Sequence, residues 1–273
     1  MTAGNGDGAV TTRLVDVPAG TVEVLEGGEG APLLFLHGAG GVPLWEGVLP
    51  LLAREYRVYA PLLPGFGRST GLDALEDQLD LFFHCFDVME ALGIERPYIV
   101  GESMGGWIAA EMAALRPAEV SRLILAAPVG LWRDAYPVAD MFGMMTHEIV
   151  PLLFHDQGCA AAQQMLSLST LLSEKDDRSE EQVEMLIAVA RGMRTAAKFL
   201  FPVPDAGLEK RLWRITAPTL IVWGAEDGFI SPTYGELFCA AIRGAKLHTI
   251  PAAGHLLALE QPAALADAIK AFA

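Results

Sequence analysis

Short and nearly continuous runs of apolar residues recur along this chain, with longer segments of mixed polarity between them. Two segments of alternating polarity come first, at residues 12–17 and 21–26, and Pro18-Ala19-Gly20 between them predicts a turn. The later runs are uninterrupted, which is typical of strands buried on both faces of a sheet. The pattern therefore predicts eight strands, of which the last six lie at residues 33–36, 58–62, 98–100, 123–126, 220–223 and 246–250.

Segments of helical length separate most of these strands. They lie at residues 45–54, 74–92, 104–115, 233–242 and 262–272. Alternation of strands and helices is typical of an α/β protein with a parallel sheet. The alternation is interrupted between about residues 131 and 215, where the sequence is mostly helical and rich in methionine. A segment of that length is too long for a loop, so we expect a helical insertion at 131–215 in a core formed by residues 1–130 and 216–273.

Composition and charge narrow the classes of partner. The chain has 273 residues, of which 52% are hydrophobic, and its 34 acidic against 19 basic residues give a net charge of −15. This apolar content is sufficient for a large core and excludes a mainly disordered chain. The negative charge disfavours nucleic acid and anionic membranes as partners, and a homodimer stays open. We expect a cytoplasmic protein, because there is no signal-peptide pattern and no apolar stretch near the roughly 18 residues of a membrane helix.

The cysteines give no sign of a disulfide framework or a metal site. Cys85, Cys159 and Cys239 lie far apart and have no neighbouring ligand cluster. We expect them to be small buried apolar residues. The glycines near residue 40 do not fit a dinucleotide-binding motif, so the sequence predicts neither a metal nor a cofactor.

The clearest chemical motif is Gly101-Glu102-Ser103-Met104-Gly105, which follows a predicted strand and precedes a predicted helix. Its two glycines allow a sharp turn and a close approach of helix and strand, so that the Ser103 hydroxyl is exposed at the carboxyl edge of the sheet. We interpret the motif as a nucleophile elbow. Glu102 is then its variable position, which we expect to be solvated or hydrogen-bonded.

A serine hydroxyl is a poor nucleophile at neutral pH and needs a histidine base that is oriented by an acid. His255 follows the last predicted strand, where a loop can carry such a base. Asp227 follows the preceding strand and is the candidate acid, with Glu226 as its competitor. We expect His37 to be a structural hydrogen-bonding residue. The remaining histidines are expected at the surface or on a helix face, namely His84, His147, His155 and His248.

Two further motifs, Leu36-His37-Gly38-Ala39-Gly40-Gly41 and Pro64-Gly65-Phe66-Gly67-Arg68-Ser69, precede the elbow. With them the chain resembles the serine-nucleophile branch of the α/β-hydrolase superfamily over nearly its whole length. The resemblance implies a mostly parallel eight-stranded sheet flanked by helices, with the insertion as a helical lid. It also implies an oxyanion hole formed by the backbone N–H groups of Ala39 and Met104. One departure is Leu62, where the family usually has an aspartate.

This machinery suits acyl transfer through an acyl-enzyme and requires no cofactor. We expect a carboxylesterase whose partner is a small-molecule ester of small to medium size and apolar character. Its expected substrate-binding residues are Gly38, Gly40, Met141, Met144, Met145 and Leu256.

Three alternatives are weighed against the esterase. Epoxide hydrolases and haloalkane dehalogenases have aspartate in place of Ser103 and are disfavoured. Hydrolases that break carbon–carbon bonds in ring-cleavage products share the Ser-Met-Gly-Gly elbow, but usually carry tryptophan where this chain has Leu256. They also use a lid arginine to bind a carboxylate, for which Arg191 or Arg194 would serve here. A slow-turnover ligand receptor on the same fold is the third alternative.

Overall fold

Eight strands form one sheet in the order β1-β2-β4-β3-β5-β6-β7-β8. The computed structural model describes residues 10–41, 45–173, 178–203, 205 and 207–272. β2 is antiparallel to both of its neighbours, and the other adjacent pairs are parallel, so the predicted eight-stranded, mostly parallel sheet is confirmed. The strands are β1 (Thr11–Val17), β2 (Gly20–Gly27), β3 (Ala31–Leu36), β4 (Tyr56–Pro61), β5 (Tyr98–Glu102), β6 (Arg122–Ala126), β7 (Thr219–Gly224) and β8 (Lys246–Ile250).

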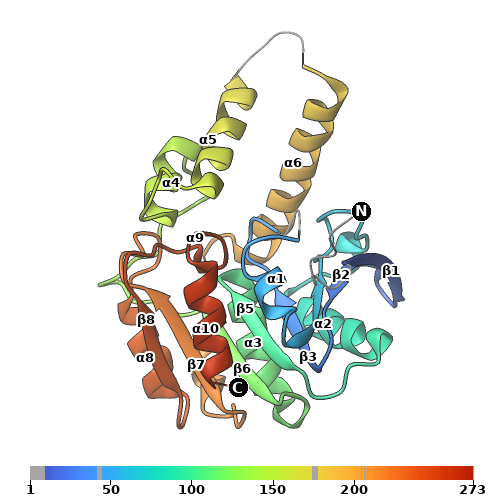
Figure 1. Ribbon diagram of the computed structural model, residues 1–273, viewed down its shortest axis with the longest axis vertical. Helices are drawn as coiled ribbons and strands as arrows, with labels where there is room; N and C mark the ends of the chain where they lie inside the picture. Colours follow the sequence, from blue (N-terminus) through green and yellow to red (C-terminus); the bar gives the residue numbers. More distant parts are fainter. Residues whose placement is uncertain (1–9, 42–44, 174–177, 204, 206, 273) are drawn as a thin grey trace, which may run out of the picture.

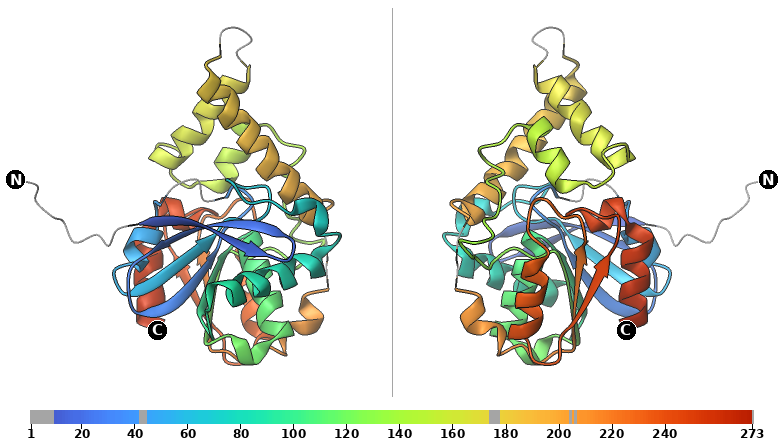
Figure 2. Two further views of the ribbon diagram at one scale, coloured as in Figure 1. Left: turned by 90° about the vertical axis from the view of Figure 1, so that its right-hand side faces the viewer. Right: turned by 90° about the vertical axis from the view of Figure 1, so that its left-hand side faces the viewer.

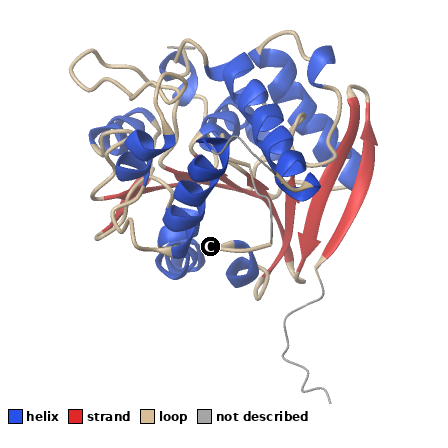
Figure 3. Cartoon of the chain, turned by 90° about the horizontal axis from the view of Figure 1, so that it is seen from above, coloured by secondary structure: helices blue, strands red, loops and turns tan. Residues whose placement is uncertain are grey.

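Helices cover both faces of the sheet (Figure 3). Helices α2 (Gln78–Leu92), α3 (Met104–Leu115) and α8 (Thr233–Ala241) pack on one face, and α1 (Leu49–Leu52) and α10 (Pro262–Phe272) pack on the other. Successive strand residues point to opposite faces, so each central strand contributes to two separate cores. In β6, for example, Leu123 and Leu125 belong to the first core and Ile124 to the second. This double burial explains the uninterrupted apolar runs in the sequence.

Helix α2 begins four residues later than the sequence pattern indicated. A short 3₁₀ helix, Leu72–Ala74, comes first, and Asp77 then caps α2 by accepting the backbone N–H groups of Leu79 and Asp80. The Asp80 side chain reaches back to the Asp77 backbone N–H and completes a capping box. These polar contacts, rather than the apolar periodicity, determine where the helix starts.

Between β6 and β7 the chain leaves the sheet, and its described residues there form four helices. They are α4 (Thr146–Leu153), α5 (Ala160–Ser173), α6 (Glu180–Leu200) and α7 (Glu209–Leu212). Figures 1 and 2 show α4, α5 and α6 standing above one edge of the sheet, with α5 and α6 extending farthest from it. Helix α7 instead packs against α3 of the core, where Arg211 forms an ion pair with the buried Glu111.

The cysteines are less uniformly buried than expected. Cys85 lies in the core, whereas Cys159, directly before α5, and Cys239, within α8, are only half-buried. Among the described residues, no helix has both the length and the apolar character needed to cross a bilayer.

Candidate active site

Ser103 occupies the sharp turn between β5 and α3. Its backbone has φ 54° and ψ −114°, a conformation that is strained for a residue with a side chain. The neighbouring glycines make this turn possible, since a Cβ on Gly105 would lie 2.0 Å from the Leu36 carbonyl oxygen. A Cβ on Gly101 would lie 2.3 Å from the Gly105 carbonyl oxygen. The local geometry is that of a nucleophile elbow.

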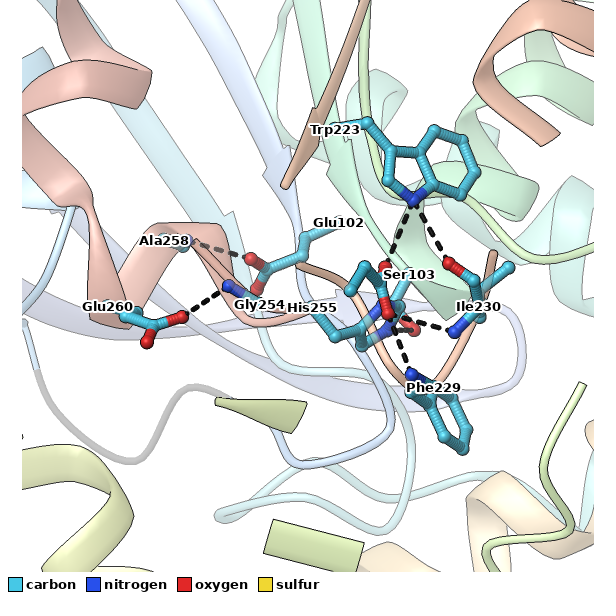
Figure 4. Close-up of polar contacts among 10 residues, drawn as sticks. Glu102, Ser103, Trp223, Phe229, Ile230, Gly254, His255, Ala258 and Glu260 are labelled. Atoms are coloured by element: carbon cyan, nitrogen blue, oxygen red, sulfur yellow. Dashed lines mark hydrogen bonds and ion pairs between the residues drawn. The ribbon is translucent and has the colours of Figure 1, made fainter. Parts of the chain in front are cut away.

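The structure brings Ser103, His255 and Asp227 together although they lie on three separate loops. Figure 4 shows Ser103 beside His255. His255 Nε2 is 2.9 Å from Ser103 Oγ, and His255 Nδ1 is 2.9 Å from Asp227 Oδ2. All three side chains are buried. This arrangement allows His255 to accept the Ser103 proton while Asp227 holds the ring in the required tautomer.

Asp227 is held in place by donors from its own loop and from β7. Its Oδ1 accepts the backbone N–H groups of Phe229 at 2.9 Å and Ile230 at 2.8 Å. Its Oδ2 accepts the indole N–H of Trp223 at 3.0 Å in addition to the bond with His255. Four donors thus occupy the lone pairs of one carboxylate and fix its orientation toward His255. The apolar run in β7 gave no indication that Trp223 has this role.

Glu226, the competing acid, does not contact His255. Its side chain points along the histidine loop, where Oε2 accepts the backbone N–H of Ala253 at 3.0 Å. The residue is exposed, unlike Asp227. Of the two acids, the structure brings Asp227 to the base.

The two expected oxyanion-hole donors belong to residues next to Ser103, Met104 in the chain and Ala39 in the pocket. Met104 is the first residue of α3, where N–H groups have no intrahelical partner. Ala39 lines the same pocket as Ser103, and a Cβ added to Gly38 would lie 3.3 Å from Ser103 Cβ. Within the described part of the chain, the hydrogen bonds outside helices and strands leave the N–H groups of Ala39 and Met104 unused. Both are therefore available to a substrate oxygen.

His37 holds the loop next to these donors. Its Nδ1 donates to the Gly38 carbonyl at 2.7 Å, and its Nε2 accepts the Leu63 backbone N–H at 3.0 Å. Burial lowers the pKa of His37 to about 4, so the ring stays neutral. Leu62, at the position where an aspartate is usual, is buried, and its carbonyl accepts the Ser69 hydroxyl at 2.7 Å. These contacts are consistent with the structural role expected for His37.

An apolar pocket opens onto Ser103. It contains no charged side chain, and Ser103 is its only polar lining residue among those that the structure describes. The lining consists of Ala39, Ser103, Val129, Val138, Met141, Phe142, Leu200, Val203 and Phe229.

Only some of the expected substrate-binding residues lie in this lining. Met141 does, but Met144, Met145 and Leu256 do not, and Met145 is 67% exposed. Gly38 lies against Ser103, whereas Gly40 is exposed.

The loop that carries His255 is held by partners from four other segments. Gly254 N–H donates to Glu260 Oε2 at 2.6 Å, and Ala258 N–H donates to Glu102 Oε1 at 2.8 Å. The N–H groups of His255 and Leu256 both donate to the Leu153 carbonyl at the end of α4, at 2.8 and 3.3 Å. The Ala253 N–H donates to Glu226 Oε2, and the Leu257 N–H donates to the His255 carbonyl. Every backbone N–H from residue 253 to residue 258 therefore has a partner.

The solvated position expected for Glu102 is wrong, and the hydrogen-bonded alternative holds. The residue is only 6% exposed, and its carboxylate accepts the backbone N–H of Ala258 in α9 (Leu257–Glu260). Burial raises the pKa of Glu102 to about 7, although the hydrogen bond from Ala258 and the charge of His255 both lower this pKa.

Of the two positions expected for His84, the surface is wrong and the helix face is right. It lies on the buried side of α2, and burial lowers its pKa to about 4. It is one of the buried residues on the apolar face of this helix, which a lone histidine in the sequence does not reveal. His147, His155 and His248 are exposed, as expected.

The two candidate lid arginines lie on α6, outside the pocket lining. Arg194 forms an ion pair with Asp73 of the core. Arg191 is exposed and lies one turn before Thr195, whose hydroxyl donates to the Pro64 carbonyl at 2.6 Å. Of the two, Arg191 is the one that forms no ion pair with a described residue.

A Ser–His–Asp triad at the carboxyl edge of a mostly parallel sheet defines a serine hydrolase. The chain belongs to the family described as the alpha/beta hydrolase fold, whose model matches residues 31–262.

Individual relatives lie at modest identity but cover most of the chain. A 2-hydroxy-6-oxo-6-phenylhexa-2,4-dienoate hydrolase of Burkholderia cepacia is 29% identical, over 86% of this chain and 84% of its own length. A dihydrolipoyllysine-residue acetyltransferase component of an acetoin cleaving system from Cupriavidus necator is 31% identical, over 95% of this chain and 68% of its own. The solved structure of a serine hydrolase involved in carbazole degradation superposes with a TM-score of 0.76 at 25% identity, covering 97% and 98% of the two chains.

Proposed function

We propose that this protein is a serine hydrolase that breaks a carbon–carbon bond next to a ketone in 2-hydroxy-6-oxohexa-2,4-dienoate compounds. The proposal is carried by the Ser103–His255–Asp227 geometry in a chain similar to the Burkholderia cepacia hydrolase of the 6-phenyl compound. That compound has no ester or amide bond, so its hydrolysis has to break a carbon–carbon bond. This ranking reverses the one expected from the sequence, which placed ester hydrolysis first.

The triad performs this reaction in two stages. Ser103 Oγ attacks the ketone carbon while His255 takes its proton, and the N–H groups of Ala39 and Met104 bind the oxyanion. For this bond to break, C5 has to be sp³, so the substrate reacts as its 2-oxo tautomer, in which the proton of the 2-hydroxyl has moved to C5. The bond between C5 and the former ketone carbon then breaks, its electron pair forms a dienolate that extends to the C2 oxygen, and His255 returns the proton to this leaving group. Water activated by His255 hydrolyses the acyl-Ser103 ester. The products are a carboxylic acid and a 2-hydroxydienoate.

The two ends of such a substrate need different surroundings. The apolar lining around Ser103 suits the uncharged aryl or alkyl group on the ketone. The substrate carboxylate needs a cation, and none lies in the lining formed by described residues. Arg191 on α6 is our candidate for this partner, since Arg194 pairs with Asp73.

Ester hydrolysis is the second candidate, and two observations favour it. The pocket lining is apolar except for Ser103, which suits a neutral ester at both ends. Leu256 also stands where carbon–carbon hydrolases of this type usually carry tryptophan.

The test compares kcat/KM for 2-hydroxy-6-oxo-6-phenylhexa-2,4-dienoate and 4-nitrophenyl butyrate. We expect faster turnover of the dienoate and loss of both activities in Ser103→Ala by a factor of about 10⁴ or more. Arg191→Gln should raise KM for the dienoate about tenfold and leave the ester unaffected, with Arg194→Gln as the matched control.

Faster turnover of 4-nitrophenyl butyrate than of the dienoate would support ester hydrolysis, the second candidate, instead of carbon–carbon bond cleavage. Turnover that persists in Ser103→Ala would refute both candidates. A single bound product per chain without further release would indicate the receptor.

A further inference from the structure

Glu102 is a buried carboxyl group next to the nucleophile that the triad mechanism does not use. It ends β5 and directly precedes Ser103 in the chain, yet its side chain reaches a segment 156 residues away. There Oε1 accepts the backbone N–H of Ala258, three residues after His255. The side chain thus links the nucleophile elbow to the loop that carries the base (Figure 4).

We propose that Glu102 is a positioning residue for His255, which holds the histidine loop through Ala258 and, when ionised, stabilises the imidazolium formed as Ser103 attacks. The proposal rests on the triad of the proposed function, but it requires neither of the two substrate classes. A carboxylate close to a protonated histidine lowers its free energy most where water is excluded, as it is around Glu102.

The surroundings of Glu102 make its charge sensitive to pH in the neutral range. The titratable groups that act on it are His255, which lowers its pKa, and Asp227, which raises it. Burial is the largest effect and brings the pKa to about 7. The Glu102 charge is therefore absent in weakly acidic solution and present in weakly basic solution.

Glu260 provides a matched control on the same loop. Its Oε2 accepts the Gly254 N–H on the other side of His255, and its Oε1 accepts the Asp156 N–H of the insertion at 2.6 Å. Like Glu102, it holds the loop through a backbone N–H. Unlike Glu102, it lies outside the nucleophile elbow.

The first measurement is the rate at which a fluorophosphonate labels Ser103, because this reaction uses the triad without a particular substrate. Glu102→Gln keeps a carbonyl acceptor for Ala258 but removes the charge. We expect the ratio of wild-type to Glu102→Gln rates to rise from about one at pH 6 to about five or more at pH 8.5. Glu260→Gln should change the rate by a factor that does not depend on pH.

The second measurement is the melting temperature, which needs no active triad. The carboxyl of Glu102 ionises near its ordinary pKa of 4.5 in the unfolded chain and near 7 in the folded protein, so the wild type loses stability as pH rises between these values. Glu102→Gln has no such loss. Its melting temperature relative to the wild type should therefore increase between pH 5 and pH 8.

A second substitution at Glu102 separates the effect of its charge from the effect of its hydrogen bond with Ala258. Glu102→Asp keeps a titrating group but is one methylene too short for Ala258, so it should label slowly at every pH while keeping a pH-dependent ratio to Glu102→Gln. A rate ratio or melting difference that is constant with pH would overturn the proposal. Failure of the proposed function would be recognised by a different result, namely the absence of Ser103-dependent turnover with either substrate.

Discussion

The loop of His255 and the outer part of the helical insertion are built in opposite ways. Every backbone N–H from 253 to 258 has a partner, and three of the acceptors are carboxylates. The first half of α6, by contrast, exposes a series of apolar side chains, namely Val183, Met185, Ile187 and Val189. The contrast indicates that the chemistry depends on a few fixed polar contacts, and that the outer insertion can vary without disturbing them.

The inner parts of the insertion resemble the loop of His255 rather than the outer part, because hydrogen bonds connect them to the core. At the end of α4, the Leu152 carbonyl accepts the Gly228 N–H of the acid loop at 3.1 Å, and Leu153 holds the base loop. The second half of α6 is fastened to the core through Thr195 and through Lys198, whose ammonium donates to the Leu72 carbonyl at 3.0 Å. Substitutions should therefore have effects that decrease from the triad loops, through the pocket, to the outer part of α6.

The largest effect is expected at the acid of the triad. Asp227→Asn keeps the shape of the side chain but removes the charge that stabilises the imidazolium, and it should lower kcat by about 10³–10⁴. Glu226→Gln, on the adjacent residue, should cost less than about tenfold, since the Glu226 side chain accepts the Ala253 N–H and forms no hydrogen bond with His255 among the described residues. Steady-state kinetics of the two variants provide the measurement. Greater damage from Glu226→Gln would mean that the acid has been misassigned.

An intermediate effect is expected in the pocket. Met141 lines it, so Met141→Ala removes apolar contact with bound substrate and should raise KM about fivefold, which corresponds to about 1 kcal/mol, with kcat within threefold. Met145→Ala is the control, because Met145 lies outside the lining and is largely exposed. Equal effects of the two substitutions on KM would show that the pocket extends over the outer methionines.

The smallest effect is expected on the exposed face of α6. Ile187→Ser replaces an exposed side chain and should change kcat/KM by less than twofold and stability by less than about 0.5 kcal/mol. Thermal unfolding and the same kinetic assay test this. A tenfold loss of activity would contradict the contrast between the two regions, because it would place the outer helix in the catalytic cycle.

The fold could be predicted from the sequence because burial on both faces of the sheet leaves an uninterrupted apolar run in each central strand. The sequence also located the triad loops, since Ser103, Asp227 and His255 each follow such a run within a recognisable motif. It did not reveal Trp223, Glu102 or Glu260, whose partners are set by the packing of segments. The bond from Ala258 to Glu102 joins residues 156 apart, and no local pattern encodes it. The start of α2 was missed for a related reason, because a polar capping box overrides the apolar period.

The central claim is that Ser103 attacks the ketone of a dienoate and carries the acyl group away. Peptide mass mapping after rapid quenching of the reaction with 2-hydroxy-6-oxo-6-phenylhexa-2,4-dienoate tests it most directly. The account predicts a benzoyl ester on the peptide that contains Ser103, its absence in Ser103→Ala, and release of benzoate and 2-hydroxypenta-2,4-dienoate in equal amounts. Equal product release without any acyl group on Ser103, or an acyl group on another residue, would contradict it.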